Sequence, residues 1–392
     1  MDTRMKFAFH VSPNLQSSNS TQKIMRNLTI GLLIVFAASD IYYFVRWGAA
    51  FGLQALLLLG CSLITTFVCE AIFAKVKKEN IKDFITHSFG WVTSLILVMM
   101  CPITIPPYAV IIATIFAIVF GRLVFGGFGF NIFNPAAVGR AVIFASFSGA
   151  ATASLVTTSA TPTTLMANAF NWLPGTEAAL DAYLDSVGGW SSLFMGFYPG
   201  AIGETMSLLI LLIGIWLIVK NVIDWRIPVF YLGTIAVIAM IIAIATGIES
   251  WHGVPGFIWY PLLHLLTGGV IFGGVFMLTD PVTMPTVPSG RIFFAMCAAA
   301  ITVLIRVKGN RPEGCMYSIL IMNTFTPMIE SALDAPQLKQ MKKAWTMIAC
   351  AAVFAVCVGF YDATEKPQRA IPSELKETAV LVMNTENEGK GA

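Results

Sequence analysis

A run of hydroxyl side chains interrupts a chain that is otherwise almost continuously apolar. Residues 157–164 read Thr-Thr-Ser-Ala-Thr-Pro-Thr-Thr, and residues 151–219 contain no Lys or Arg. A hydroxyl group that faces solvent can accept a covalently attached phosphate group. In a polytopic membrane protein, a loop without basic residues is expected on the side away from the cytoplasm. We therefore expect this run to be accessible to a modifying enzyme outside the cytoplasm.

Two carboxylates form a second set of residues that could do chemistry. Glu204 lies just before an apolar run, and Asp280 precedes Pro281 within an interrupted run. An ionisable group at mid-bilayer costs at least ~2.5–3.5 kcal/mol, so such a group is usually paired or functional. Because hard cations prefer oxygen ligands, both carboxylates are candidates for a Na⁺ path. In the alternative interpretation, Asp280 caps the following helix and Glu204 lies in the headgroup zone near a helix N-terminus.

Two segments with shared features break the apolar pattern at deep positions. Residues 126–140 and 273–291 each contain a pair of glycines, an Asn-Pro or Asp-Pro step, and a Gly-Arg lead into an apolar run. Such breaks at corresponding places in two halves are typical of inverted-repeat transporters with a central site. Asn134 can cap the helix that Pro135 begins, and we include Asn134 in the candidate ion path. The alternative is two unrelated proline-containing loops at the membrane edges.

The composition requires a membrane around these residues. Of the 392 residues, 57% are hydrophobic and 11% are charged, whereas soluble domains carry about 25% charged residues. The long unbroken apolar runs predict helices, not barrel strands. With a net charge of +3 and basic residues at span ends, no nucleic-acid partner is expected. The expected spans are 28–45, 49–73, 84–101, 108–125, 136–150, 205–219, 227–247, 257–278, 292–306, 313–333 and 344–361.

Basic residues set the expected orientation of these spans. Clusters at 6–26, 75–82, 220–226 and 339–343 fall on one side of the membrane if the N-terminus is cytoplasmic. The basic residues at 306–311 would fall on the opposite side of the membrane. We keep the predicted orientation because the other four clusters support it. The expected organisation is a cytoplasmic N-terminus at 1–27, a first membrane repeat at 28–150, an extracytoplasmic loop at 151–204, a second membrane repeat at 205–333, and an extra C-terminal span with an extracytoplasmic tail at 334–392.

Several short motifs spread over residues 10–335 form a recognisable set. They are Ser12-Pro13, Phe133-Asn134-Pro135-Ala136 with Gly139-Arg140, Gly203-Glu204-Thr205, His264-Leu265-Leu266-Thr267-Gly268-Gly269, Thr279-Asp280-Pro281-Val282-Thr283, Pro312-Glu313-Gly314 and Met322-Asn323. Together they resemble the RnfD/NqrB family. Its members are membrane subunits of the Rnf complex (ferredoxin–NAD⁺ oxidoreductase) and of the sodium-pumping NADH–quinone oxidoreductase. The early Ser-Pro and the short N-terminal region favour the Rnf members.

The resemblance implies an all-α polytopic fold similar to urea transporters, with about 10 core transmembrane helices in two inverted repeats. The apolar stretch at 344–361 adds an extra C-terminal helix. The resemblance also implies an FMN joined covalently through its phosphate to a Thr hydroxyl on the outer face. Here Thr161 is the expected FMN phosphoryl threonine, with Ser159 and Ala160 beside it in the motif.

The attachment motif departs from the family pattern in two ways. Ser159 stands in place of the usual small residue between Ser/Thr and Ala, if Thr158 is the motif hydroxyl. Leu155 stands where the family usually has an acid, and Thr163 and Thr164 are the alternative attachment sites. A second, non-covalent flavin (riboflavin) is also implied. The flavins would carry the electrons, while the protein supplies position and electrostatics.

The same resemblance implies a place in a larger assembly. The chain would be one subunit of an ion-translocating oxidoreductase, a translocase of the bacterial inner (cytoplasmic) membrane. Its partners would be the A, B, C, E and G subunits of the Rnf complex, a flavin transferase, membrane lipid, and Na⁺ or H⁺. Two other functions stay open: a passive channel or secondary transporter for a small solute, and the NqrB counterpart. The cysteine spacing fits no metal site and no catalytic triad is evident, so no catalytic or metal-binding residue is predicted.

Overall fold

The computed structural model describes residues 20–147, 162–198, 200–309 and 314–368, and every element of regular structure in these ranges is a helix. Five helices are long and apolar enough to cross a membrane, which takes about 20 residues. They are α1 (Thr21–Trp47), α2 (Ala49–Lys77), α12 (Arg226–Thr246), α15 (Pro288–Val307) and α17 (Gln337–Asp362). The chain is therefore an all-α polytopic membrane protein, which confirms the predicted fold class.

The other helices are shorter or interrupted. In chain order they are α3 (Ile81–Ser88), α4 (Gly90–Met99), α5 (Pro107–Ile115), the π-helix η1 (Phe116–Leu123), α6 (Pro135–Ser146), α8 (Pro162–Phe170), α9 (Glu177–Val187), α10 (Gly189–Met195), α11 (Ser207–Val219), α13 (Gly256–Leu266), α14 (Val270–Phe272), the π-helix η2 (Gly273–Met277) and α16 (Cys315–Leu333). Each of the predicted spans overlaps at least one of the described helices.

Two of the predicted spans, 84–101 and 257–278, are broken in the middle. Phe89, with a left-handed φ of 55°, separates α3 from α4. The axes of α13 and the α14–η2 segment meet at 69°, and the break contains Gly268 with a φ of 79°, which favours glycine. Non-helical backbone at membrane depth is tolerated only where protein surrounds it or where it lines a cavity. These breaks therefore point to the interior of the protein.

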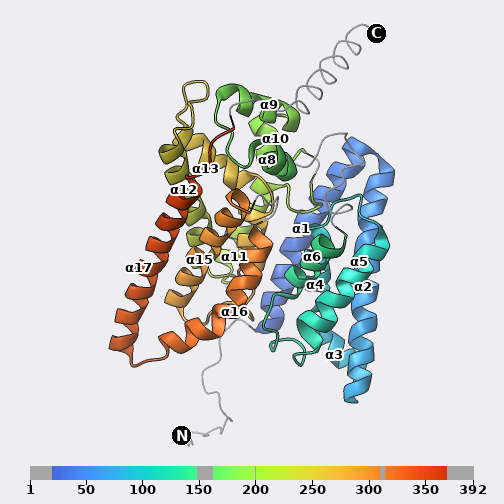
Figure 1. The fold of residues 1–392 in the computed structure, drawn as a ribbon. Coiled ribbons are helices and arrows are strands. Elements are labelled where there is room, and N and C mark those ends of the chain that lie inside the picture. Colours follow the sequence, from blue (N-terminus) through green and yellow to red (C-terminus); the bar gives the residue numbers. More distant parts are fainter. Residues whose placement is uncertain (1–19, 148–161, 199, 310–313, 369–392) are drawn as a thin grey trace, which may run out of the picture.

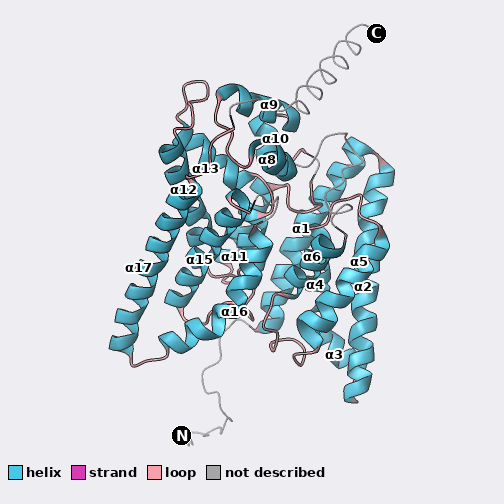
Figure 2. Cartoon of the chain, in the orientation of Figure 1, coloured by secondary structure: helices cyan, strands magenta, loops and turns pink. Residues whose placement is uncertain are grey.

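Helices α1 to α6 and α11 to α17 form two groups that stand side by side (Figures 1 and 2). Within the first group α2 packs against α1, α4 and α5, and within the second α12 packs against α13, α15 and α17. Across the boundary, α1 packs against α11 and α6 packs against α16. Each group contains a π-helical segment upstream of its Asn-Pro or Asp-Pro step.

Helices α8, α9 and α10 lie together at one end of the bundle (Figure 1). They belong to the predicted loop at 151–204, so the described part of that loop is largely helical. Trp251 Nε1 donates to Asp181 Oδ1 at 2.6 Å, and the backbone N–H of His252 donates to Glu177 Oε1 at 3.0 Å. These bonds join α9 to the connection between α12 and α13.

Two of the basic residues that opposed the predicted orientation, Arg306 and Lys308, are bound to other parts of the protein, while Arg311 lies outside the described residues. Arg306 is fully buried in α15 and donates to the carbonyls of His264 at 2.7 Å and Thr267 at 2.8 Å. Because those carbonyls lie where α13 breaks, Arg306 supplies donors that a continuous helix would have supplied. Lys308 forms an ion pair with Glu365 at 2.8 Å. Neither is a solvated loop charge, the kind on which the positive-inside tendency rests.

Arg291, in the first turn of α15, is tied to the connection between α11 and α12. It donates to the carbonyl of Pro285 at 2.9 Å and forms an ion pair with Asp224, which also pairs with Arg226 at 3.1 Å. Burial alone would raise the pKa of the Asp224 carboxyl. Hydrogen bonds from the Arg226 backbone and from Arg291, together with both guanidinium charges, outweigh that effect and hold the pKa below its ordinary value.

Candidate functional site

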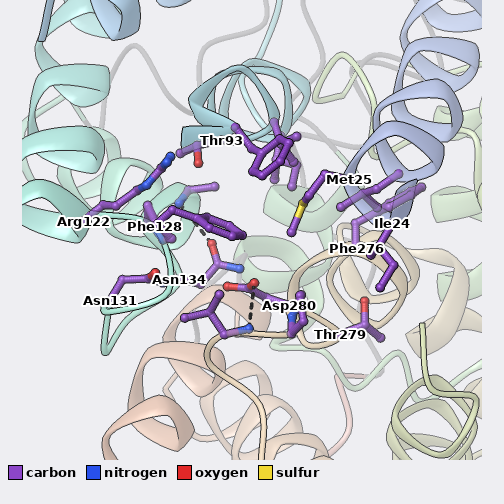
Figure 3. A pocket seen from close by; sticks show the side chains of 18 of the residues that line it. Ile24, Met25, Thr93, Arg122, Phe128, Asn131, Asn134, Phe276, Thr279 and Asp280 are labelled. Atoms are coloured by element: carbon purple, nitrogen blue, oxygen red, sulfur yellow. Dashed lines mark hydrogen bonds between the residues drawn. The ribbon is translucent and has the colours of Figure 1, made fainter. Parts of the chain in front are cut away.

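A cavity with a mostly apolar lining and a few polar side chains lies between the two groups of helices, where their interrupted segments meet (Figure 3). Its volume is about 60 Å³, and one water needs at least ~10–15 Å³. The cavity therefore has room for several water molecules. Its polar lining residues are Thr93, Arg122, Asn131, Asn134, Thr279 and Asp280.

Asn134 joins the two groups of helices at this cavity. Its Oδ1 accepts hydrogen bonds from the backbone N–H groups of Ala136 at 3.0 Å and Ala137 at 3.3 Å, which confirms that Asn134 caps α6. Its Nδ2 donates to the carbonyl of Met277, the last residue of η2, at 3.1 Å. The side-chain amide of Asn323, on α16, is oriented so that its oxygen and its nitrogen both have hydrogen-bond partners. In this orientation Asn323 Oδ1 accepts from the Asn134 backbone N–H at 2.9 Å. One side chain and its backbone thus connect α6 with η2 and α16.

Asp280 caps a turn and not the helix that follows. Its Oδ1 accepts from the Val282 backbone N–H at 3.3 Å, and its Oδ2 accepts from Thr283 Oγ1 at 3.2 Å. The next helix, α15, begins only at Pro288, and its N-cap residue Val287 makes no side-chain cap bond. The alternative prediction that Asp280 caps the following helix is therefore wrong, because an intervening turn uses the carboxylate. Asp280 remains half-buried and lines the cavity (Figure 3).

A buried ion pair lies behind one wall of the cavity. The guanidinium of Arg122 is 3.7 Å from Glu70 Oε1 and donates to Ser88 Oγ at 2.9 Å, while Ser88 Oγ donates to Glu70 Oε1. The side chains of Arg122 and Glu70 are 2% and 0% exposed. Arg122 also lies within electrostatic reach of Asp280. Removing either partner of such a pair leaves an uncompensated buried charge, which is strongly destabilising.

The sequence analysis identified neither Ser88 as a partner of this pair nor the space around Glu70. A β-carbon at Gly90 would lie only 2.2 Å from Glu70 Oε1 and 2.7 Å from Thr66 Cγ2. The absent side chain of Gly90 is therefore what admits the Glu70 carboxylate. The only signal in the sequence was an acid, Glu70, within an apolar run, followed by the Ser-Phe-Gly step at 88–90.

Glu204 lies at a different place from Asp280. Its side chain is buried, at 7% exposure, and its Oε1 is 2.7 Å from where a β-carbon on Gly269 would stand. The loop before it is fixed to the end of α4, because the Gly203 backbone N–H donates to the carbonyl of Met99 at 2.7 Å. Glu204 is thus buried against the start of α14.

The two acids stand at opposite ends of one short segment. Gly269 precedes α14, Met277 ends η2, and Asp280 follows shortly after. The eight intervening helical residues, Val270–Met277, span about 12 Å at 1.5 Å per residue. The structure therefore brings Asn134 and Asp280 together at the cavity, and it places Glu204 near the far end of α14–η2.

The predicted flavin motif is only partly covered by the described residues. Ser159, Ala160 and Thr161 lie outside them, while the next residue, Pro162, begins α8. Thr164 is buried within α8, which makes its hydroxyl a poor target for a modifying enzyme. The assignment of FMN to Thr161 stays a prediction.

Comparisons with known proteins give consistent results. The chain matches the family model described as NQR2, RnfD, RnfE over residues 8–339. It is 36% identical over 334 residues to the D subunit of the proton-translocating ferredoxin:NAD(+) oxidoreductase complex of Clostridium ljungdahlii, covering 83% of this chain and 93% of that protein. It is 34% identical over 325 residues to the D subunit of the Na(+)-translocating ferredoxin:NAD(+) oxidoreductase complex of Acetobacterium woodii, covering 81% and 91%. It is also 34% identical over 304 residues to the B subunit of the Na(+)-translocating NADH-quinone reductase of Chromohalobacter salexigens, covering 75% and 70%.

The packing around Glu70 gives a test of the buried ion pair. Gly90→Ala should destabilise the protein by roughly 1–3 kcal/mol, because the added methyl group forces the Glu70 carboxylate away from Ser88. Thermal unfolding of the purified protein in detergent, followed by tryptophan fluorescence, measures this. Gly60→Ala on α2 is the control, since no atom lies within 4 Å of its new β-carbon and helix propensity rises. Equal unfolding temperatures for the two variants would contradict the described packing.

Proposed function

The chain belongs to the NQR2, RnfD, RnfE family, and we propose that it is the D subunit of an Rnf-type complex that couples electron transfer from ferredoxin to NAD⁺ with translocation of Na⁺ or H⁺. The observation that carries the proposal is the similarity, at 36% and 34% identity, to two proteins named as the D subunit of such a complex, over more than nine-tenths of their lengths. The name of one specifies protons and that of the other Na⁺, so identity alone does not select the ion.

Within this protein, we assign the ion path to the cavity between the two groups of helices. Asp280 supplies a carboxylate oxygen, and the side chains of Asn134 and Thr279 line the same cavity. Oxygen ligands of this kind suit a hard cation such as Na⁺, and a carboxylate can also carry a proton. Glu204, near the far end of α14–η2, is the second acidic position of the path. The Arg122–Glu70 pair keeps a positive charge close to the cavity without leaving it uncompensated.

We assign the covalent FMN to Thr161, with Ser159 and Ala160 as its neighbours in the motif, and we retain riboflavin as a second, non-covalent flavin. An FMN bound there would accept and release electrons. The chain itself would hold the isoalloxazine near one end of the bundle, because Thr161 directly precedes α8. We place this end outside the cytoplasm and the N-terminus inside, in a bacterial inner membrane.

The chain would work with other subunits. It lacks a dinucleotide fingerprint, so we expect ferredoxin and NAD⁺ to be bound by other members of the set A, B, C, E and G. Much of α2 is exposed, and this surface is available to lipid or to those subunits. A flavin transferase would attach the FMN. The similarity to the B subunit of a quinone reductase keeps that function as the second candidate, which quinone reduction in place of NAD⁺ reduction would reveal.

The flavin assignment predicts a covalent, fluorescent product. After co-expression with the flavin transferase, the denatured protein should give a fluorescent band on a gel under ultraviolet light. Thr161→Ala should abolish the band because it removes the acceptor hydroxyl, while Thr163→Ala should keep it. A band that persists in Thr161→Ala would move the tether to another residue, and no band in the wild type would contradict covalent attachment.

The ion-path assignment predicts a loss of transport in Asp280→Asn. Without the carboxylate, uptake of Na⁺ or H⁺ by inverted vesicles, driven by ferredoxin oxidation, should fall by roughly tenfold or more, as expected when a ligand worth ~1.4 kcal/mol is lost. Asp334→Asn is the control, because Asp334 is exposed at the end of α16. Equal uptake in Asp280→Asn and the control would remove Asp280 from the path.

A further inference from the structure

The C-terminal part of the described chain lies beyond the matched family range. That range ends at residue 339, within the first turn of α17. Helix α17 packs along α12 and α15 at the side of the second group (Figure 1). Residues 363–368 then continue past the end of α17 and meet the segment that follows α8. The extension therefore covers one face of the bundle and also contacts the segment that follows α8.

The end of α17 is fastened to the core by Lys308. Its Nζ donates to Thr364 Oγ1 at 2.6 Å and to Glu365 Oε1 at 2.8 Å, and it lies 4.7 Å from the ring centre of Tyr361. These three contacts fix the direction in which the chain leaves the helix. Asp362, the last residue of α17, is fully buried, so the end of this helix is enclosed by protein.

Beyond this point the chain pairs with residues 173–175 in the manner of a short parallel bridge. The Gln368 backbone N–H donates to the carbonyl of Leu173 at 2.9 Å, and the Gly175 backbone N–H donates to the carbonyl of Gln368, also at 2.9 Å. A β-carbon on Gly175 would lie 2.6 Å from Pro367 Cβ. The close approach of the two backbones at this point therefore requires glycine.

The segment held in this way directly follows the C-terminal end of α8. Asn171 and Trp172 have left-handed φ values of 53° and 62°, so the chain turns sharply after Phe170. Trp172 is fully buried, its carbonyl accepts from Tyr260 Oη at 3.0 Å, and the guanidinium of Arg306 lies 4.4 Å from its ring centre. One end of α8 is thus fixed by α13 and α15 from one side and by the C-terminal extension from the other.

We propose that residues 363–368 act as a strap that holds the segment after α8, and through it α8 itself, on the bundle. This inference rests on the proposed attachment of FMN at Thr161, the residue before α8. A displacement of about 1 Å by a change far from the reacting groups can cost roughly 100-fold in rate. Gln368 acts through its backbone, as a positioning residue that does not touch the flavin.

The backbone nature of the contact offers a matched pair of variants in the assembled complex. Gln368→Pro removes the N–H that bonds to Leu173, whereas Gln368→Ala keeps it. In Gln368→Pro, amide hydrogen exchange at 171–175 and in α8 should rise about threefold to tenfold, the change expected from one lost hydrogen bond. Ferredoxin-dependent NAD⁺ reduction should slow, while the flavin fluorescence of the denatured band stays the same. Gln368→Ala should match the wild type in all three measurements.

A second variant keeps the test decisive if Gln368→Pro fails to assemble. Gly175→Ala pushes against Pro367 and should loosen the same segment, with Gly233→Ala on α12 as the control because nothing lies within 4 Å of its β-carbon. Unchanged exchange in α8, or faster exchange with unchanged NAD⁺ reduction, would overturn the positioning role. Loss of fluorescence in the wild type would contradict the Thr161 tether, and the exchange data would still decide whether the strap holds α8.

Discussion

Backbone groups at helix ends inside a membrane must find hydrogen-bond partners within the protein, because lipid offers none. Asn134 provides hydrogen-bond partners for two such helix ends. Its amide oxygen accepts from the first N–H groups of α6, while its amide nitrogen donates to the carbonyl of Met277 at the end of η2. The two interrupted helices therefore satisfy each other through one side chain. The cavity exists at this point because both helices stop there.

The same rule explains where the other buried charges lie. Arg306 donates to the carbonyls exposed by the break after α13. Glu204 stands at the start of α14, where the positive end of a helix dipole favours an anion. Arg122 is held by Glu70 and Ser88 beside the cavity. These charges mark the ends of broken helices, and this arrangement provides polar positions between the two groups of helices without exposing polar backbone to lipid.

Sequence patterns were sufficient for the elements and for part of the site. Long apolar runs indicated the spans, and the Asn-Pro step correctly indicated that Asn134 caps α6. The patterns could not show that Asp280 serves a turn, because helix and turn capping use the same residue types and differ only in where the next helix begins. Nor could they show the relation of Glu204 to Gly269 or of Gln368 to Leu173, since both contacts join distant segments through backbone or through a missing side chain.

The central claim is that the bond between Asn134 and Met277 joins the two halves at the ion path. Asn134→Asp tests it most directly, because an aspartate still caps α6 but cannot donate to the Met277 carbonyl. Asn80→Asp is the matched control, since Asn80 caps α3 and makes no second bond of this kind among the described residues. The measurement is the number of ions moved per electron pair transferred to NAD⁺ in inverted vesicles. The account predicts a lower ratio in Asn134→Asp than in Asn80→Asp, and equal ratios in the two variants would contradict it.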